Sequence, residues 1–201
     1  MLRIGITGGI GSGKSIASRL FQAMGVPTYD ADSRARWLME NDEELRQQLT
    51  AAFGPATYTA TGHLNRPLLA GTVFNNPPLL ARLNALVHPH VRTDFERWAG
   101  FQEQAGHAYV LKEAALLFEA GSYKQLDQII TVFAPLPVRQ ARVLRRDPHR
   151  SVADIQAIMG KQLSEDEKLQ RAHHVLTNDD VQPLLPQVLA LHALFSAAPR
   201  A

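Results

Sequence analysis

A phosphate-binding motif near the N-terminus constrains the fold of this chain more than any other feature. Residues Gly8 to Ser15 read Gly-Gly-Ile-Gly-Ser-Gly-Lys-Ser and match the pattern G-x-x-x-x-G-K-[ST] without a gap. Residues 2–7 alternate apolar side chains as a short strand does. Residues 16–24 place apolar side chains at helical spacing, and Gly25 stands where a helix C′ glycine belongs. Strand, glycine loop and helix in this order predict a binding site for a nucleoside triphosphate.

The residue types of the loop suit the binding of phosphates. Glycine lets backbone N–H groups converge on phosphate oxygens, and a helix N-terminus adds a favourable dipole. Lys14 is predicted to reach the β- and γ-phosphates, and the Ser15 hydroxyl is predicted to bind Mg²⁺. The predicted phosphate site comprises Gly8, Gly9, Gly11, Ser12, Gly13, Lys14 and Ser15.

Composition is that of an ordinary globular protein and disfavours several function classes. Of the 201 residues, 45% are hydrophobic and 20% charged, which allows one domain or one domain with insertions. The 21 Lys and Arg against 19 Asp and Glu leave no large surplus for nucleic acid. The chain has no cysteine, and its histidines lack zinc-like spacing, so Mg²⁺ with ATP is the metal we expect. Without an apolar span or a secretory signal, we expect a cytoplasmic protein with no membrane partner.

The rest of the chain predicts an α/β fold. Five short apolar segments alternate with helical ones, which favours a parallel five-stranded sheet with helices on both faces. Residues 33–105 contain no convincing strand and are predicted to be a helical insertion near the carboxyl ends of the sheet, where ligands bind. The core is then residues 1–32 and 106–201. The expected strands are 2–7, 26–29, 109–111, 128–133 and 174–176, and the expected helices 33–49, 79–87, 91–104, 138–146, 151–162 and 184–195.

Prolines and caps set the expected ends of several helices. Pro77-Pro78 and His88-Pro89 are predicted to break the helical insertion. Ser151 followed by Asp154 has the pattern of a capping box at the start of a helix that runs through Gln162.

Motifs that the chain lacks narrow the reaction class. It has neither the Asn-Lys-x-Asp motif of GTPases nor a strand that ends in four apolar residues and Asp-Glu, as in motor ATPases. A small-molecule kinase is therefore favoured, and such an enzyme needs a group that orients or deprotonates the acceptor hydroxyl. Asp30 and Asp32 follow the second predicted strand. Either carboxylate can cap the next helix, but we predict that Asp32 acts as the general base.

A run of arginines predicts a helical lid. Arg139, Arg142 and Arg146 share one face of the predicted helix 138–146, and the lid is expected to extend over residues 138–165. A solvated helix surface is the alternative interpretation of such a run. With Arg145 and Arg150 these arginines form a basic cluster, and we predict that at least one of the five contacts the phosphates of ATP, because guanidinium groups bind phosphate in a bidentate manner.

The order of these motifs resembles that of the dephospho-CoA kinase family nearly end to end. The resemblance includes the N-terminal strand and loop, Asp30-Ala31-Asp32, His88-Pro89 and Leu116-Leu117-Phe118-Glu119. It continues through several shorter matches: Gly62 with Asn65-Arg66, Val73-Phe74, Arg142 with Arg146-Asp147, Gln162, and Val175 with Asn178. This succession is far more specific than the phosphate loop alone.

The resemblance implies an activity and a set of site residues. The reaction would transfer the γ-phosphoryl group of ATP to the ribose 3′-hydroxyl of dephospho-CoA, with Asp32 as the base and Lys14 on the phosphates. Residues 33–105 would hold the CoA moiety. The ATP site would include Gly11 to Ile16 with Arg142 and Arg146, and the substrate site Asp32, Arg66 and His88. His88 precedes a proline and has a structural cap as its alternative role.

The chain departs from the family pattern at several positions. Arg139 stands where glutamine is common, and Ile16 where threonine is usual, although Ser15 keeps the metal-binding hydroxyl. The remaining departures are Asn84 for glutamate, Ala115 for proline, and His173-His174 in place of an Ala-Asp pairing. None of them alters Lys14 or Asp32.

Two alternative functions remain open at this point. A shikimate-kinase-like enzyme also combines a phosphate loop with an Asp-x-Asp after the second strand, but it predicts a second glycine-rich motif, which the chain lacks after Gly9. A non-enzymatic ATP-dependent regulator or RNA-binding protein predicts a basic surface with aromatic residues, for which the chain gives no pattern. The sequence makes no prediction of oligomeric state.

Overall fold

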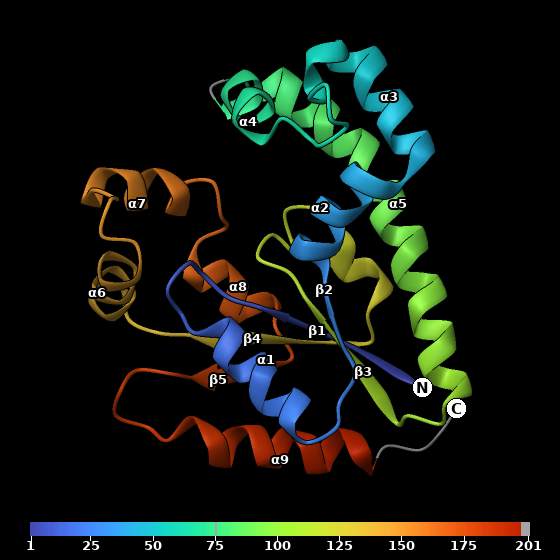
Figure 1. The fold of residues 1–201 in the computed structure, drawn as a ribbon. Coiled ribbons are helices and arrows are strands. Elements are labelled where there is room, and N and C mark those ends of the chain that lie inside the picture. Colours follow the sequence, from blue (N-terminus) through green and yellow to red (C-terminus); the bar gives the residue numbers. More distant parts are fainter. Residues whose placement is uncertain (75, 198–201) are drawn as a thin grey trace. The chain divides into compact units, whose positions relative to one another are not determined.

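A computed structural model describes residues 1–74 and 76–197 (Figure 1). The chain forms two compact units. The first comprises Met1–Asp30 and the chain from Ala99 onward, and the second comprises Ala31–Trp98. The first unit holds the sheet and the phosphate loop, whereas the second is helical. None of the helices in the described ranges is long and apolar enough to cross a membrane.

The sheet of the first unit has five parallel strands, as predicted, and their order is β2-β3-β1-β4-β5. Its strands are β1 (Leu2–Thr7), β2 (Thr28–Asp30), β3 (Tyr109–Glu113), β4 (Gln128–Phe133) and β5 (His174–Thr177). The carboxyl end of β3 lies between those of β1 and β2, because Glu113 is in register with both Ile6 and Asp30. The acidic end of the second strand is therefore one strand farther from the loop than the end of β3.

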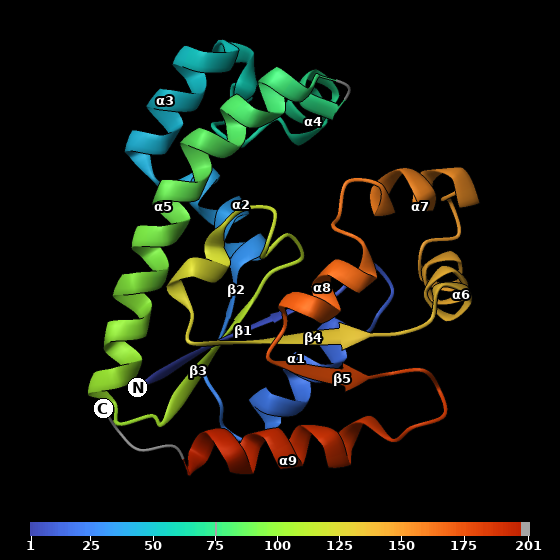
Figure 2. The same ribbon diagram turned by 180° about the vertical axis from the view of Figure 1, so that it is seen from behind.

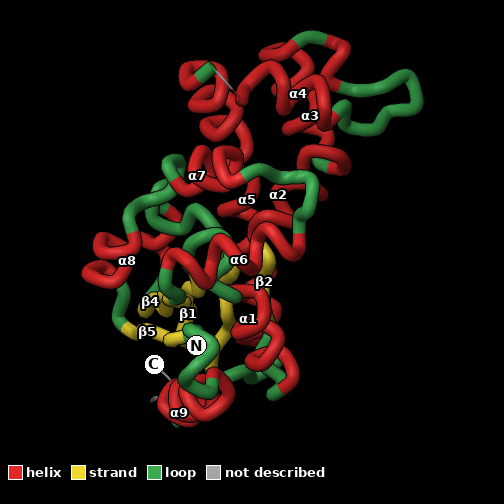
Figure 3. Tube along the Cα trace, turned by 90° about the vertical axis from the view of Figure 1, so that its left-hand side faces the viewer, coloured by secondary structure: helices red, strands yellow, loops and turns green. Residues whose placement is uncertain are grey.

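Helices cover both faces of the sheet (Figures 2 and 3). Helices α1 (Lys14–Ala23) and α9 (Leu184–Ser196) pack on one face, and α8 (Glu165–Arg171) lies on the other. Ile4, Ile6, Phe21, Val188 and Phe195 form part of the core under α1 and α9, and each is at most 1% exposed. On the opposite face, a Cβ at Gly5 would lie only 2.6 Å and 2.8 Å from the side chains of Leu126 and Leu117. This close approach explains the glycine in the middle of β1.

Helix α1 ends in the C′ glycine motif that the sequence predicts. Gly25 has φ 82°, and its N–H donates to Gln22 O at 2.9 Å. Val26 N donates to Phe21 O at 3.1 Å, which completes a Schellman motif. The left-handed conformation favours glycine because a Cβ would meet the following carbonyl.

The second unit contains more helix breaks at its start than we predict. One helix is expected over 33–49, but α2 (Ala31–Asn41) and α3 (Glu43–Phe53) divide this segment. Asp42 causes the division by capping α3, since its Oδ1 accepts a hydrogen bond from Leu45 N at 2.9 Å. A 3₁₀ turn, Pro55–Thr57, and α4 (Arg66–Phe74) follow.

The predicted break at His88-Pro89 is wrong. Helix α5 runs without interruption from Pro77 to Gln104 with Pro89 inside it. Proline removes one backbone donor, but the apolar stripe continues across it, because Val87, Val91, Phe95 and Ala99 lie four residues apart and are all buried. Tertiary packing of this stripe outweighs the lost hydrogen bond.

The segment after β4 forms three helices, of which one is missed by the sequence analysis. Before β4 the chain forms a 3₁₀ turn at Ser122–Gln125. After β4, helix α6 (Leu136–Arg146) begins close to the predicted start. Helix α7 (Val152–Met159) starts with the predicted capping box of Ser151 and Asp154 but ends before Gln162. Helix α8 then begins with a second capping box, formed by Ser164 and Glu167, which the sequence analysis does not identify.

Substitution of two glycines by alanine tests the role of backbone conformation. Gly25→Ala should lower the free energy of unfolding by about 1 kcal/mol, because its φ is positive while nothing lies within 4 Å of a Cβ there. Gly100→Ala is the matched control in α5, also with nothing within 4 Å, and should raise the free energy by about 0.5–1 kcal/mol. Urea unfolding followed by circular dichroism measures both. Equal effects of the two substitutions would contradict this account.

Candidate phosphate-binding site

The phosphate loop connects the carboxyl end of β1 to the first turn of α1. Gly11 and Gly13 have φ 81° and 90°, so the loop takes the left-handed conformations that favour glycine. No side chain of the described residues caps α1, and its first turn carries no acidic residue. The positive end of the helix dipole therefore faces the loop with no side-chain cap at Gly13, as at helix N-termini that bind anions.

Each of four loop glycines lies against a different group. A Cβ at Gly8 would stand 2.6 Å from Val132 O, and one at Gly11 would stand 2.5 Å from Arg139 O. At Gly9 and Gly13 it would collide with side-chain nitrogens of Arg139 and Asn178. The glycines thus serve both the turn and the close packing of the loop against β4, α6 and the segment after β5.

Glu113 at the end of β3 contacts both functional side chains of the loop. Its Oε1 accepts hydrogen bonds from Lys14 Nζ at 2.6 Å and from Ser15 Oγ at 2.8 Å. The Lys14 and Glu113 side chains are 13% and 11% exposed, so water screens the ion pair only weakly. Lys14 is held by a single carboxylate at the N-terminus of α1, where it can reach an incoming phosphate.

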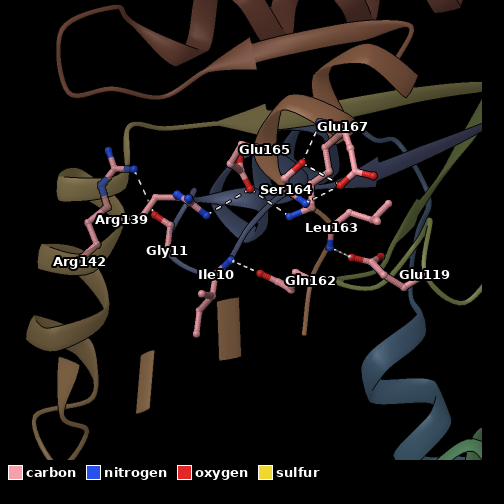
Figure 4. A network of polar contacts seen from close by, with 11 residues as sticks. Ile10, Gly11, Glu119, Arg139, Arg142, Gln162, Leu163, Ser164, Glu165 and Glu167 are labelled. Carbon is pink, nitrogen blue, oxygen red and sulfur yellow. Dashed lines mark hydrogen bonds and ion pairs between the residues drawn. The ribbon is translucent and has the colours of Figure 1, made fainter. Parts of the chain in front are cut away.

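Side chains from distant segments hold the backbone of the loop (Figure 4). Ile10 N donates to Gln162 Oε1 at 3.0 Å. Asn178 Nδ2 donates to Ser12 O at 2.8 Å. Arg142 Nη1 lies 3.4 Å from both Gly11 O and Ser12 O, and its Nη2 pairs with Asp180. The predicted lid arginine Arg142 thus contacts carbonyl groups of the loop in this structure.

A buried ion cluster lies beside the same loop. Arg139 Nη1 and Lys168 Nζ lie 3.2 Å and 3.0 Å from one oxygen, Glu165 Oε1. The Arg139 and Lys168 side chains are 8% and 1% exposed. The cluster joins α6 to α8 next to Gly9 and combines two cations with one carboxylate.

Arg146 lies away from the loop contacts just described. Its guanidinium makes two hydrogen bonds to the Asp147 carboxylate, at 3.0 Å and 2.9 Å, and Arg150 pairs with the same carboxylate at 3.1 Å. The hydrogen bond from Arg146 holds the pKa of Asp147 below its usual range. Arg146 is therefore committed to a local ion pair in this structure, at the exposed end of α6.

The predicted acceptor-side residues belong to the second unit. Asp32 lies in the first turn of α2, Arg66 pairs with Glu40 at 3.1 Å, and His88 is exposed on α5. Asp32 follows Asp30, the last residue of β2, by two positions. The connection is therefore at most about 7.6 Å long between their Cα atoms.

A pocket of about 540 Å³ in the second unit lies on other helix faces than these residues. It is lined by Arg34, Trp37, Leu38, Asn41, Asp42, Glu44, Pro89, His90, Thr93, Asp94 and Arg97. At about 100° per residue, Trp37 and Asn41 are about 140° and 180° from Asp32 around α2. His90 and Arg97 are about 160° and 180° from His88 around α5. Asp32, Arg66 and His88 are not among the residues that line the pocket.

Several partners that hold the loop were not predicted from the sequence. Glu113 carried a signal, because it ends a strand, but the order of strands that places it beside β1 was not predicted. Gln162 and Asn178 are part of the family resemblance, but no role in holding the loop was assigned to either. Glu165 gave no signal, since the helix that carries it was missed. Among the described residues no group of three or more His, Cys, Asp or Glu could hold a metal ion.

Removal of the Glu113 charge tests the contact to Lys14. Glu113→Gln should lower the free energy of unfolding by about 2 kcal/mol, because the Lys14 ammonium loses its charged partner in a mostly buried site. The double variant Lys14→Met/Glu113→Gln should lower the free energy of unfolding by less than the sum of the two single substitutions, and the difference should be about 1 kcal/mol or more. Glu103→Gln is the control, since its carboxylate pairs with the N-terminus while 56% exposed. Urea unfolding measures all four variants, and additive effects at positions 14 and 113 would refute the coupling.

Comparison with known proteins identifies relatives along nearly the whole chain. A family model described as dephospho-CoA kinase matches residues 2–183. A dephospho-CoA kinase of Bacteroides fragilis is 38% identical over 192 residues, covering 96% of this chain and 92% of the relative. One of Deinococcus radiodurans is 42% identical over 176 residues, covering 88% and 83%.

Solved structures of similar proteins have the same fold. A Thermus thermophilus protein of known crystal structure is 36% identical and matches with a TM-score of 0.82 over 99% of this chain and 98% of its own. A dephospho-CoA kinase from Campylobacter jejuni matches with a TM-score of 0.71 at 22% identity over 96% of both chains, which supports the fold alone. By its family model and its relatives, this chain belongs to the dephospho-CoA kinase family.

Proposed function

We propose that this protein transfers the γ-phosphoryl group of ATP to the ribose 3′-hydroxyl of dephospho-CoA and releases CoA and ADP. The observation that carries the proposal is the contact of Glu113 with Lys14 and Ser15 at the uncapped N-terminus of α1, in a chain of this family. That end of the helix provides backbone donors, a dipole and a positioned ammonium group for the polyphosphate. Transfer of a phosphoryl group requires mainly positioning and charge stabilisation, which these groups supply.

The donor half of the reaction rests on the first unit. The loop residues Gly8 to Ser15 and the neighbouring Ile16 would surround the phosphates of ATP. Lys14 would exchange its hydrogen bond with Glu113 for contacts to the β- and γ-phosphates. We propose that Arg142 and Arg146 contribute to ATP binding from the lid of residues 138–165, and Arg142 already touches the loop.

Mg²⁺ fits the oxygen donors at the start of α1. The Ser15 hydroxyl and the Glu113 carboxylate lie together, and hydroxyl and carboxylate oxygens are the ligands that Mg²⁺ prefers. Ser15 would hold the ion directly, with Glu113 beside it. When bound together with ATP, Mg²⁺ neutralises charge on the phosphate oxygens.

We assign the acceptor half to the predicted helical insertion, residues 33–105, most of which belongs to the second unit, with Asp32 as the base. In the proposed step the 3′-oxygen of the acceptor forms a bond to the γ-phosphorus, and the bond from that phosphorus to the β-γ bridging oxygen breaks. ADP leaves with the bridging oxygen, and the hydroxyl proton passes to the Asp32 carboxylate. The short connection from β2 supports this role, and Arg66 and His88 are proposed to contact the substrate.

An acceptor-dependence assay tests the proposed reaction. The purified protein with Mg²⁺ and ATP should release ADP only when dephospho-CoA is added, and ³¹P NMR should show a new 3′-phosphomonoester in the product. Lys14→Met should abolish the release, because the ammonium group at the phosphates is lost. Shikimate is the control acceptor. Turnover with shikimate, or ADP release that needs no acceptor, would overturn the assignment.

Substitution of Asp32 tests its role as the base. Asp32→Asn should lower kcat about 100-fold or more, because the amide cannot accept the hydroxyl proton. ATP affinity measured by calorimetry should change less than about twofold, since the donor half does not contain Asp32. Glu43→Gln, an exposed acid in the first turn of α3, is the matched control and should leave kcat unchanged. A kcat near that of the unmodified enzyme would remove the base assignment from Asp32.

A further inference from the structure

The cluster of Arg139, Lys168 and Glu165 contributes more than a link between α6 and α8. We propose that its excess positive charge raises the affinity of the phosphate loop for polyphosphate, which makes Arg139 an electrostatic determinant of ATP binding. The proposal rests on the proposed function in one respect, namely that ATP is the donor.

The charge balance around the loop distinguishes this cluster from the other ion pairs. Lys14 pairs with Glu113, and Arg142 with Asp180, so each pair joins one cation to one carboxylate. In the cluster, two cations share the single oxygen Glu165 Oε1. The formal charge of the cluster is therefore +1. The cluster therefore supplies a net charge that the other two pairs do not.

Burial makes this charge effective over a longer distance. The Arg139 and Lys168 side chains are 8% and 1% exposed, and salt screens buried charges much less than exposed ones. Arginine keeps its proton in proteins, so burial does not neutralise it. The Nε atom of Arg139 is also buried without a hydrogen-bond partner among the described residues. The charge is thus only partly compensated by its surroundings.

The position of Arg139 directs the charge at the loop. A Cβ added to Gly9 would collide with Arg139 Nη1 and would lie 2.5 Å from Glu165 Oε1, and one added to Gly11 would lie 2.5 Å from Arg139 O. The guanidinium thus packs directly on the loop whose backbone N–H groups would hold the phosphates (Figure 4). A fixed positive charge in this place, with little water between, attracts an anion more strongly than it would in solvent.

A series of variants that changes the charge of the cluster stepwise tests this proposal. The charge is 0 in Arg139→Gln, +1 in the native protein and in Arg139→Lys, and +2 in Glu165→Gln. The double variant Arg139→Gln/Glu165→Gln returns it to +1. Calorimetry measures the affinity of each protein for Mg²⁺-ATP, for tripolyphosphate and, as an uncharged control, for adenosine.

We expect affinity to follow the charge. Arg139→Gln should bind ATP and tripolyphosphate about 10-fold more weakly, Arg139→Lys should stay within about threefold of the native protein, and the double variant should recover most of the loss. Glu165→Gln should bind tripolyphosphate more tightly although its melting temperature falls. Adenosine affinity should not change across the series.

A merely structural role gives a different pattern. Damage to packing would make the double variant the weakest binder, and Arg139→Lys would bind as weakly as Arg139→Gln. Either result, or native affinity in Arg139→Gln, overturns the inference. If Glu165→Gln fails to fold, the comparison of Arg139→Gln with Arg139→Lys decides alone. A native protein that binds tripolyphosphate but not ATP contradicts the proposed function instead, because the donor would then be a different molecule.

Discussion

The contact between Glu113 and the pair Lys14 and Ser15 depends on one feature of the sheet, the position of β3 directly beside β1. Parallel strands end at the same edge, so the last residue of β3 meets the first turn of the helix that follows β1. A carboxylate there keeps the ammonium of Lys14 compensated in a site that is mostly shielded from water. The side chains that would bind a polyphosphate are therefore positioned by the sheet.

The surroundings of the loop explain why four of its positions are glycine. Gly11 and Gly13 have a positive φ. Gly8 and Gly9 do not, and they are glycine because neighbouring groups leave no space for a Cβ. Apart from the Ser12 hydroxyl, which lies against Gly8, these groups come from β4 and from the α6 and α8 cluster, more than a hundred residues later in the chain. The glycines of the motif are thus required both by the conformation of the turn and by the packing of distant elements against it.

Local signals in the sequence were sufficient for much of the fold and for part of the site. The loop, the C′ glycine at Gly25 and the box at Ser151 are short-range patterns, and the structure confirms all three. The sheet was predicted from its alternation of strands and helices, but the order of its strands was not, so the role of Glu113 was missed. The helix break predicted at Pro89 is wrong, because α5 is held by the burial of its apolar stripe. Such tertiary packing cannot be predicted from the presence of a proline. The same holds for Gln162 and Asn178, whose contacts join segments far apart in the chain.

The contacts of the loop also restrict which part of the predicted lid can move. Arg139 at its start and Gln162 near its end are both attached to the loop region, one by burial beside Gly9 and the other by the hydrogen bond to Ile10. Between these anchors, residues 145–154 are mostly exposed, and Arg146 and Arg150 share the carboxylate of Asp147. A lid that closes over ATP without disturbing the loop must therefore bend within this stretch. Arg146 would reach a phosphate by giving up its bonds to Asp147, whereas Arg139 acts from where it already lies.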